Sequence, residues 1–163
     1  MLARTAMALV ACLAIVASAS AQRSQLRVGD NAPGLDIQNW FNGEATTIES
    51  GKVYVVEFWA TWCGPCKKSI PHLNALHNEY GPQGLTIIGV SSDDKSPDIV
   101  QRFVAQQGPA MSYLVGVDRD GNTKSAWMEA AKQNGIPCAF VVDRNSKVVF
   151  IGHPLDEQFD RAV

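Results

Sequence analysis

The sequence predicts an α/β sandwich, in which strands and helices alternate along the chain and a hairpin closes the fold. Three observations lead to this prediction. Two short runs, 52–60 and 85–91, are apolar on both faces, as in strands at the centre of a sheet. Two longer segments, 65–79 and 97–107, repeat apolar residues at helical spacing. Near the end, the turn sequence DRNSK separates two apolar runs, which is typical of a hairpin.

The composition fits one domain with its own hydrophobic core. The chain has 163 residues, of which 46% are hydrophobic and 18% are charged. The formal net charge is −2, and the sequence contains no basic stripe that would suggest a nucleic-acid partner. We therefore expect a monomeric domain that binds no nucleic acid.

The first 21 residues have the composition of a signal peptide. Arg4 is their only charged residue, and an apolar run follows from Ala6 to Ala17. Ala19-Ser20-Ala21 then gives the small-x-small pattern that a signal peptidase cleaves. The apolar run is too short to span a bilayer. We expect cleavage near Ala21, with the mature protein in the periplasm or secreted.

A lipid anchor is the alternative for this segment. Leu9-Val10-Ala11-Cys12 matches a lipoprotein cleavage box, which would leave the protein attached at Cys12. Residues 22–34 are polar and end in a Gly- and Pro-containing stretch, so they are expected to form a linker. The folded domain is then expected to occupy residues 35–163.

Seven strands are expected along this domain. The two apolar runs named above are the central ones, and shorter β-type segments precede and follow them. In chain order the expected strands are 35–40, 45–48, 52–60, 85–91, 113–117, 139–142 and 148–151.

Three helices are expected between the strands, and a further one at the end. Apolar residues at helical spacing support 65–79 and 97–107, and Gly135 closes a helix expected at 123–134. After Gly152, four apolar residues share one helical face: Leu155, Phe159, Ala162 and Val163. We expect this last helix to continue beyond the end of the given chain.

Two cysteines stand where the central strand 52–60 passes into the next helix. In this position the helix amino terminus, with its unpaired N–H groups, stabilises a thiolate at the first cysteine. Cys63 is therefore expected to be an exposed nucleophile, and Cys66, one turn into the helix, the resolving thiol. Gly64 allows a tight turn between them, and Pro65 suits the first helical turn.

Two other readings of the pair are weaker. A metal site would need further ligands, and the sequence has no second C-x-x-C. His72 and His77 are five residues apart, so they diverge on a helix. A purely structural disulfide would close too short a loop to restrain the unfolded chain. The sequence therefore favours a redox-active pair without a metal or cofactor.

The segment FWATWCGPCK resembles the active site of the thioredoxin family almost residue for residue. Gly135-Ile136-Pro137 is similar to the cis-proline loop of that family, and residues 92–122 to the insertion of TlpA/ResA-type oxidoreductases and peroxiredoxins. The opening sequence VGDNAP is similar as well. The resemblance implies a thioredoxin-like three-layer sandwich with a mixed central sheet, helices on both faces, and a strand-helix insertion between the CGPC helix and the cis-proline loop.

The resemblance also implies roles for residues outside the pair. Glu57 stands where thioredoxins keep a buried Asp, and it would exchange a proton with Cys66; the alternative is a structural residue at a sheet edge or in an ion pair. A substrate-binding groove is expected around the pair. The expected groove residues are Trp62, Gly64, Pro65, Ile136, Pro137 and Gly152.

The implied function is an exported thiol–disulfide oxidoreductase. Its Gly-Pro dipeptide is that of thioredoxin, whose potential of about −270 mV suggests a reductant of client disulfides. The expected partners are client proteins, with apocytochrome c as a candidate, and a membrane protein that supplies electrons by thiol transfer. Cys138, beside the expected cis-proline, is either an inert core residue or a third reactive thiol.

Two functions from other classes remain as alternatives. A peroxiredoxin-like peroxidase would need P-x-x-x-T/S-x-x-C, but Val56 and Ala60 occupy the first and fifth positions of that motif when it is counted back from Cys63. A copper-binding module of the same fold would need a wider cysteine spacing and a dedicated histidine. Peroxide turnover and metal content, respectively, distinguish these alternatives.

Overall fold

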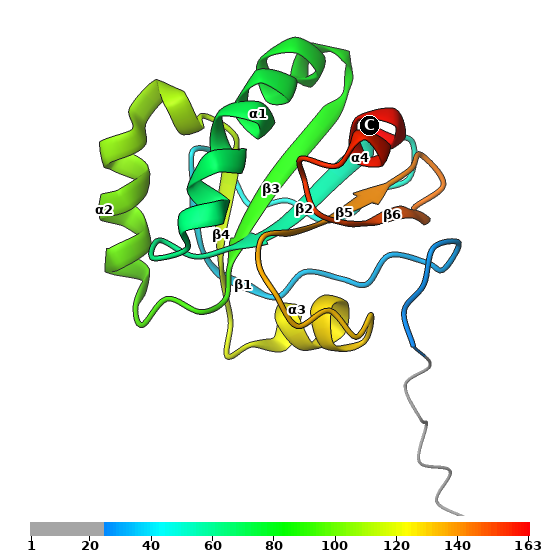
Figure 1. The fold of residues 1–163 in the computed structure, drawn as a ribbon, viewed down its shortest axis with the longest axis horizontal. Helices are drawn as coiled ribbons and strands as arrows, with labels where there is room; N and C mark the ends of the chain where they lie inside the picture. Colours follow the sequence, from blue (N-terminus) through cyan, green and yellow to red (C-terminus); the bar gives the residue numbers. More distant parts are fainter. Residues whose placement is uncertain (1–24) are drawn as a thin grey trace, which may run out of the picture.

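Six strands form one mixed sheet in the order β1-β4-β3-β2-β5-β6 (Figure 1). The structure is a computed structural model that describes residues 25–163. The expected signal peptide, residues 1–21, lies outside the described residues. β2 is parallel to β3 and antiparallel to β5, and β1 and β6 are antiparallel edge strands. The strands are β1 Ile37–Phe41, β2 Val53–Trp59, β3 Leu85–Ser91, β4 Leu114–Asp118, β5 Cys138–Val142 and β6 Val148–Gly152.

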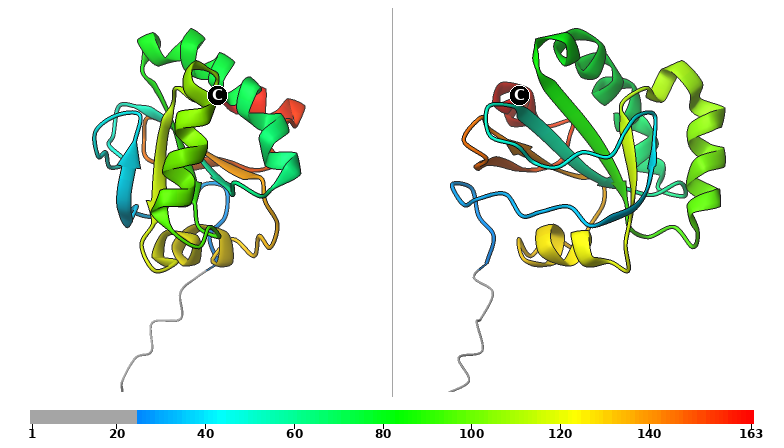
Figure 2. Two further views of the ribbon diagram at one scale, coloured as in Figure 1. Left: turned by 90° about the vertical axis from the view of Figure 1, so that its left-hand side faces the viewer. Right: turned by 180° about the vertical axis from the view of Figure 1, so that it is seen from behind.

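Helices cover both faces of the sheet, as the sequence predicted (Figure 2). One face is covered by α1, α2 and α4, and the other by α3 and the chain that follows it. The bounds are α1 Gly64–Tyr80, α2 Pro97–Gln107, α3 Asn122–Lys124 and α4 Glu157–Ala162. α2 and β4 lie within the expected insertion, between β3 and the cis-proline loop. Within residues 25–163, no helix is long and apolar enough to cross a membrane.

Each face of the sheet has its own hydrophobic core because the side chains of the strands alternate. From β2, Val55 and Trp59 pack beneath α1 and α2, whereas Tyr54, Val56 and Phe58 pack against the α3 side. Apolar residues on both faces explain why β2 has almost no polar residue. Glu57 is the exception.

The strand expected at 45–48 is not formed. Asn42, directly after β1, has a positive φ of 64°, and its side-chain amide donates to the carbonyl oxygens of Met111 and Tyr113. Gly43 follows with φ 156°, so the chain turns away from the sheet at this point. Residues 45–48 then cross from the edge of the sheet towards β2 without pairing.

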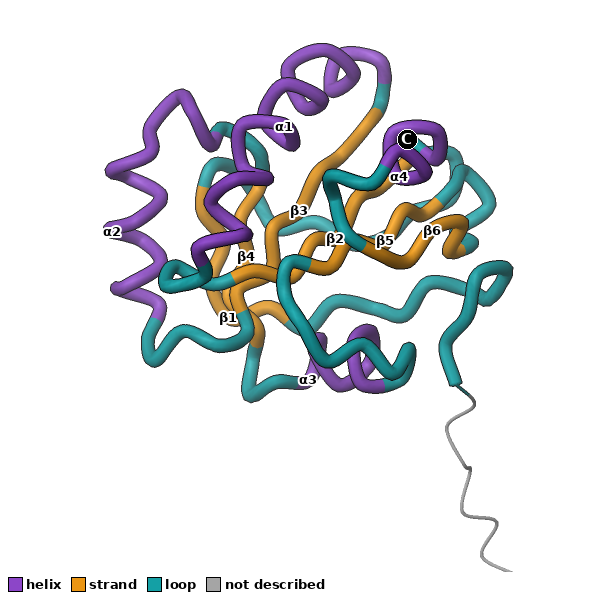
Figure 3. The backbone as a smooth tube through the Cα atoms, in the orientation of Figure 1, coloured by secondary structure: helices purple, strands orange, loops and turns teal. Residues whose placement is uncertain are grey.

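The helix expected at 123–134 is much shorter. After α3, residues Ser125–Glu129 form a π-helical turn, and Lys132 has a left-handed backbone with φ 57°. A left-handed residue ends a helix. A loop then leads to β5 and carries the cis-proline segment (Figure 3).

Part of the expected linker at 22–34 belongs to the domain. Leu26 is buried, and its backbone N–H donates to the carbonyl oxygen of Ala130. Gly29 and Asp30 exchange backbone hydrogen bonds with Val148 at the start of β6. These contacts extend the folded domain to about residue 26, because buried apolar surface and paired backbone groups hold the segment in place.

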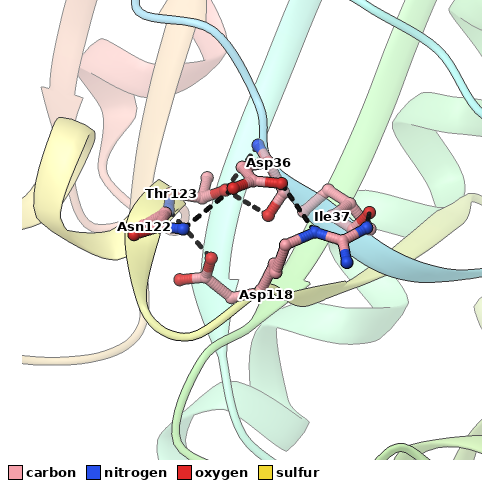
Figure 4. A network of polar contacts seen from close by, with 6 residues as sticks. Asp36, Ile37, Asp118, Asn122 and Thr123 are labelled. Carbon is pink, nitrogen blue, oxygen red and sulfur yellow. Dashed lines mark hydrogen bonds and ion pairs between the residues drawn. The ribbon is translucent and has the colours of Figure 1, made fainter.

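A polar network fixes the start of α3 at the edge of the sheet (Figure 4). Asp118, at the end of β4, accepts hydrogen bonds from the backbone N–H groups of Thr123 and Lys124. Asp36 accepts from the side chains of Arg119 and Asn122. Because α3 is only one turn long, these caps decide where the residues that follow are placed.

Candidate active site

The two cysteines of the CGPC segment form a disulfide at the amino terminus of α1. Their sulfur atoms are 2.01 Å apart. Cys63 is the N-cap of the helix, with an extended backbone, and its Sγ accepts the backbone N–H of Cys66 at 3.1 Å. Gly64 and Pro65 are the first two residues of the helix; Pro65 was predicted in this turn, whereas the helix was expected to begin one residue after Gly64. The first cysteine therefore lies where the helix concentrates its partial positive charge.

Cys63 is less accessible than the sequence suggested. Its exposed fraction is 4%, and Cys66 is fully buried. The expectation of an exposed Cys63 is therefore wrong for the disulfide form. The Cys63 Sγ lies 3.8 Å from the carbonyl oxygen of Ile136, which brings the cis-proline loop up against the pair. The Ile136–Pro137 peptide is cis, as predicted.

Glu57 is buried at the centre of the sheet, on the α1 side. Along β2 its side chain points to the same face as those of Val55 and Trp59, which pack in the core that contains Cys66. Its exposed fraction is 1%, and neither carboxyl oxygen has a hydrogen-bond partner among the described residues. Burial raises the pKa of Glu57 to about 8. A location at a sheet edge or in an ion pair is excluded by this placement.

A cleft with a volume of about 420 Å³ opens at Trp62 and Ile136, the residues next to the pair, although neither cysteine lines it. Trp62 and Ile136, which flank the pair, line it together with Met128, and Lys124 and Glu129 are among its polar residues. Trp62 is 64% exposed, unlike the buried tryptophans of the core. An exposed indole at a cleft with polar residues is a typical contact surface for another polypeptide.

Trp62 is held in place by the loop between β3 and α2. Its indole N–H donates to the carbonyl oxygen of Asp93 at 3.3 Å, and the Asp93 carboxylate pairs with Lys124. Next to it, the Asp94 carboxylate accepts hydrogen bonds from the backbone and the hydroxyl of Thr61. This pair of aspartates was not predicted from the sequence, although two acids shortly after a buried strand are a visible signal.

The other expected groove residues are placed in different ways. Pro137 lies between Ile136 and the start of β5 and, like Gly64 and Pro65, does not line the cleft. Gly152 ends β6 and pairs with Ala139, and it is not among the residues that line the cleft within the described chain. A Cβ at Gly152 would lie 2.8 Å from the Phe150 ring, so packing explains this glycine.

Cys138 is a free, buried cysteine on the α3 side of the sheet. Its side chain packs with Phe58 and Trp127, whereas Cys63 and Cys66 belong to the core beneath α1. Burial, and next the charge of Glu57, raise the pKa of Cys138 to about 12. This placement favours the inert core residue over the third reactive thiol.

Comparison with known families agrees with this geometry. The family model of the AhpC/TSA family matches residues 28–151, which is most of the chain. The chain belongs to the AhpC/TSA family. Within that family it is of the ResA/TlpA type, and its fold is thioredoxin-like.

Three proteins that are similar to this chain show which members of the AhpC/TSA family it resembles. Protein FixW of Rhizobium leguminosarum is 29% identical over 79% of this chain and 62% of its own length. The thiol-disulfide oxidoreductase ResA of Bacillus thuringiensis is 29% identical over 86% of this chain and 79% of its own. A crystal structure from Chlorobium tepidum, described as thiol:disulfide interchange protein DsbE, has 30% identity and a TM-score of 0.68, and covers 84% of this chain and 95% of its own.

These relatives and the Cys63–Cys66 disulfide identify this AhpC/TSA protein as a thiol–disulfide oxidoreductase. The chain spans less than two thirds of FixW, so the activity of that whole protein is not transferred to it. Within residues 25–163, no cluster of three or more His, Cys, Asp or Glu side chains could hold a metal ion.

Proposed function

We propose that this chain is exported and reduces disulfides of client proteins outside the cytoplasm. The observation that carries the proposal is the position of Cys63. It caps α1, its Sγ accepts the N–H of Cys66, and it adjoins the cis-proline loop at the cleft. A thiolate at this site is stabilised by the helix amino terminus and faces a surface that an extended client chain can occupy.

Cys63 is the nucleophile in this proposal because it is the outer cysteine. In the reduced protein the Cys63 thiolate attacks one sulfur of a client disulfide. The client S–S bond breaks, a Cys63–client disulfide forms, and the client's second sulfur leaves as a thiolate and takes a proton from water. The Cys66 thiolate then attacks the Cys63 sulfur and breaks the Cys63–client bond. The client sulfur leaves as a thiolate and takes a proton from water, which gives the client dithiol and the Cys63–Cys66 disulfide seen in the structure.

Glu57 is the proton acceptor for Cys66 in the second step. It lies on the α1 side of the sheet in the core that contains Cys66, and burial raises its pKa to about 8. A carboxylate at Glu57 takes the proton of the Cys66 thiol and becomes a neutral acid, which its apolar surroundings favour. A general base whose pKa lies near the working pH can both accept and return a proton.

The cleft would receive the client chain. The exposed Trp62 indole offers apolar contact, and the Ile136 backbone offers hydrogen bonds to an added strand. Proteins with two neighbouring cysteines are the client class that fits, and apocytochrome c, whose haem attachment site contains C-x-x-C, is one such protein. The oxidised protein must be reduced again, so a thiol-transferring membrane protein is the proposed electron donor.

Export is proposed from the sequence of residues 1–21, whose charge, apolar run and small-x-small pattern match a signal peptide. Expression of the full chain in a bacterial host tests this part. We expect the mature protein in the periplasmic fraction, beginning at residue 22 by mass. A protein that keeps residues 1–21 and stays in the cytoplasm would contradict it.

Client reduction is tested with the Cys66→Ala variant of the full chain. This variant is expected to accumulate client proteins in disulfide linkage to Cys63, and the Cys63→Ala variant to capture none. Both variants should lose the turnover of insulin disulfides that the unaltered protein shows. Full multiple turnover by Cys66→Ala would refute the two-cysteine mechanism. Peroxide turnover that equals insulin reduction would instead favour the peroxidase alternative.

A further inference from the structure

Four residues in the described part of the chain have buried polar atoms without hydrogen-bond partners; His77 lies in the last turn of α1, and the other three lie at or beside the central strands on the α1 side of the sheet. These three groups are the Glu57 carboxyl, the Trp59 indole N–H and the Tyr113 hydroxyl, each unpartnered within residues 25–163. Trp59 and Tyr113 are fully buried and belong to the core that contains Cys66. Unpaired buried polar groups are costly, so three of them on one side of a core require an explanation.

Gly89 brings these groups close to one another. It is the partner of Glu57 across the parallel β2–β3 pair, so both face the α1 side. A Cβ at Gly89 would lie 3.0 Å from the Trp59 Nε1 and 3.1 Å from the Tyr113 Cε2. The indole N–H and the phenol ring therefore occupy the space directly above the neighbour of Glu57. Any larger residue than glycine would push them away.

The three groups are chemically complementary. The Tyr113 hydroxyl and the Trp59 indole N–H are donors, and a charged carboxylate at Glu57 accepts hydrogen bonds only. The disulfide form favours a neutral Glu57, because burial opposes its charge. In the reduced form, by the proposed function, Glu57 has given its proton to Cys66 and is charged.

We propose that Tyr113 is a positioning residue for Glu57: in the reduced protein its hydroxyl donates a hydrogen bond to the Glu57 carboxylate, with the Trp59 indole N–H as the second donor. The inference rests on the proposed role of Glu57 and goes beyond it. No bond is made or broken by Tyr113. It stabilises the charged form of Glu57 and so keeps a base available for Cys66 near neutral pH.

Other titratable groups around Glu57 are few. From α1, Cys66 faces the same core but does not titrate in the disulfide form. From β5, Cys138 is influenced by the Glu57 charge although its side chain packs on the other face. Tyr113 precedes β4, and its own pKa is raised by burial and by Glu57. β3 contributes only Gly89 beside Glu57.

The test compares Tyr113→Phe with a matched control, Tyr54→Phe. Both tyrosines are fully buried, but Tyr54 lies on the opposite face and its hydroxyl accepts the backbone N–H of Glu49. The pKa of Glu57 is measured in the reduced full-length proteins by NMR of the ¹³C-labelled carboxyl. The pH profile for resolution of a mixed disulfide is measured in parallel, and thermal unfolding confirms that each variant is folded.

Tyr113→Phe should raise the pKa of Glu57 in the reduced protein by about one unit, so that a smaller fraction of the carboxyl is charged at neutral pH. The midpoint of the pH profile should move to higher pH by the same amount. Tyr54→Phe should change neither the Glu57 pKa nor this midpoint. In a Glu57→Gln background, Tyr113→Phe should have no further effect on the profile.

An unchanged Glu57 pKa in Tyr113→Phe, or an equal shift in Tyr54→Phe, would overturn the inference. A normal pH profile in Glu57→Gln would be a different result. It would refute the proposed base and leave the NMR titration to decide whether Tyr113 contacts the carboxylate.

Discussion

Cys138 lies on the opposite side of the central sheet from Cys66. The Cys138 side chain packs with Phe58 and Trp127 towards α3, and Cys66 packs beneath α1. β5 begins at Cys138, and its alternation sends Ala139, not Cys138, towards the α1 side. The sheet therefore separates the third thiol from the reactive pair.

We expect Cys138 to stay unlabelled when the native, oxidised protein is treated with a maleimide. Burial raises its pKa to about 12, so almost no thiolate is present at neutral pH. For the protein without residues 1–21, and so without Cys12, mass spectrometry should find one label after denaturation and none before it. Labelling of Cys138 in the native protein within minutes would revive the third-thiol mechanism.

Glu57 should make the oxidised protein less stable as pH rises. Its pKa is about 8 in the folded protein and 4.5 in the unfolded chain, so the folded state binds more protons between these values. The free energy of unfolding should fall through this window, by several kcal/mol at most.

Urea unfolding at pH 5, 6, 7 and 8 measures this dependence. Subtracting the Glu57→Gln profile isolates Glu57 from other groups, including His77, whose lowered pKa acts in the opposite direction near its own titration. Parallel profiles for the two proteins would mean that Glu57 is charged in the fold already at pH 5.

Trp62→Ala should weaken the binding of protein clients but leave the reaction with small thiols almost unchanged. Its indole is exposed at the cleft and makes no contribution to the buried core. We expect KM for a protein disulfide to rise about tenfold, since a contact tryptophan commonly contributes more than 1 kcal/mol to binding.

The matched control is Val28→Ala, which removes an equally exposed apolar side chain that does not line the cleft. Dithiothreitol should reduce the disulfide of both variants at the same rate as that of the unaltered protein. An unchanged KM in Trp62→Ala would exclude the cleft wall as the client contact.

Asp118→Ala should lower the free energy of unfolding by about 1–2 kcal/mol, the usual effect of losing a helix cap. Its carboxylate accepts the N–H groups of Thr123 and Lys124, both at 2.8 Å. Asp118→Asn retains one acceptor oxygen, so its free energy of unfolding should fall by about half as much as that of Asp118→Ala. Denaturant unfolding measures both, and equal stability of all three proteins would show that α3 needs no cap.

The local sequence determined the six strands of the sheet, the helices α1 and α2, and the reactive pair. Runs such as 85–91 and the helix 97–107 coincide with β3 and α2, because an apolar pattern of period 2 or 3.6 is a local property that tertiary contacts reinforce. The CGPC segment likewise defines its own chemistry, since the Cys63 cap and Cys66 lie within one helical turn. Turns of the chain were less predictable: Lys132 adopts a positive φ that its sequence context does not demand.

The tertiary structure alone decided what surrounds the pair. Residues that are distant in sequence line the cleft and form the group of Glu57, Gly89 and Tyr113. The contact between Trp62 and Asp93 likewise joins two loops that the sequence separates. The sequence could mark Glu57 as unusual in an apolar strand, but its pKa depends on how completely α1 and the neighbouring strands exclude water. Which face Cys138 occupies also follows from the register of β5 against β2, and register is fixed by packing between strands rather than within one.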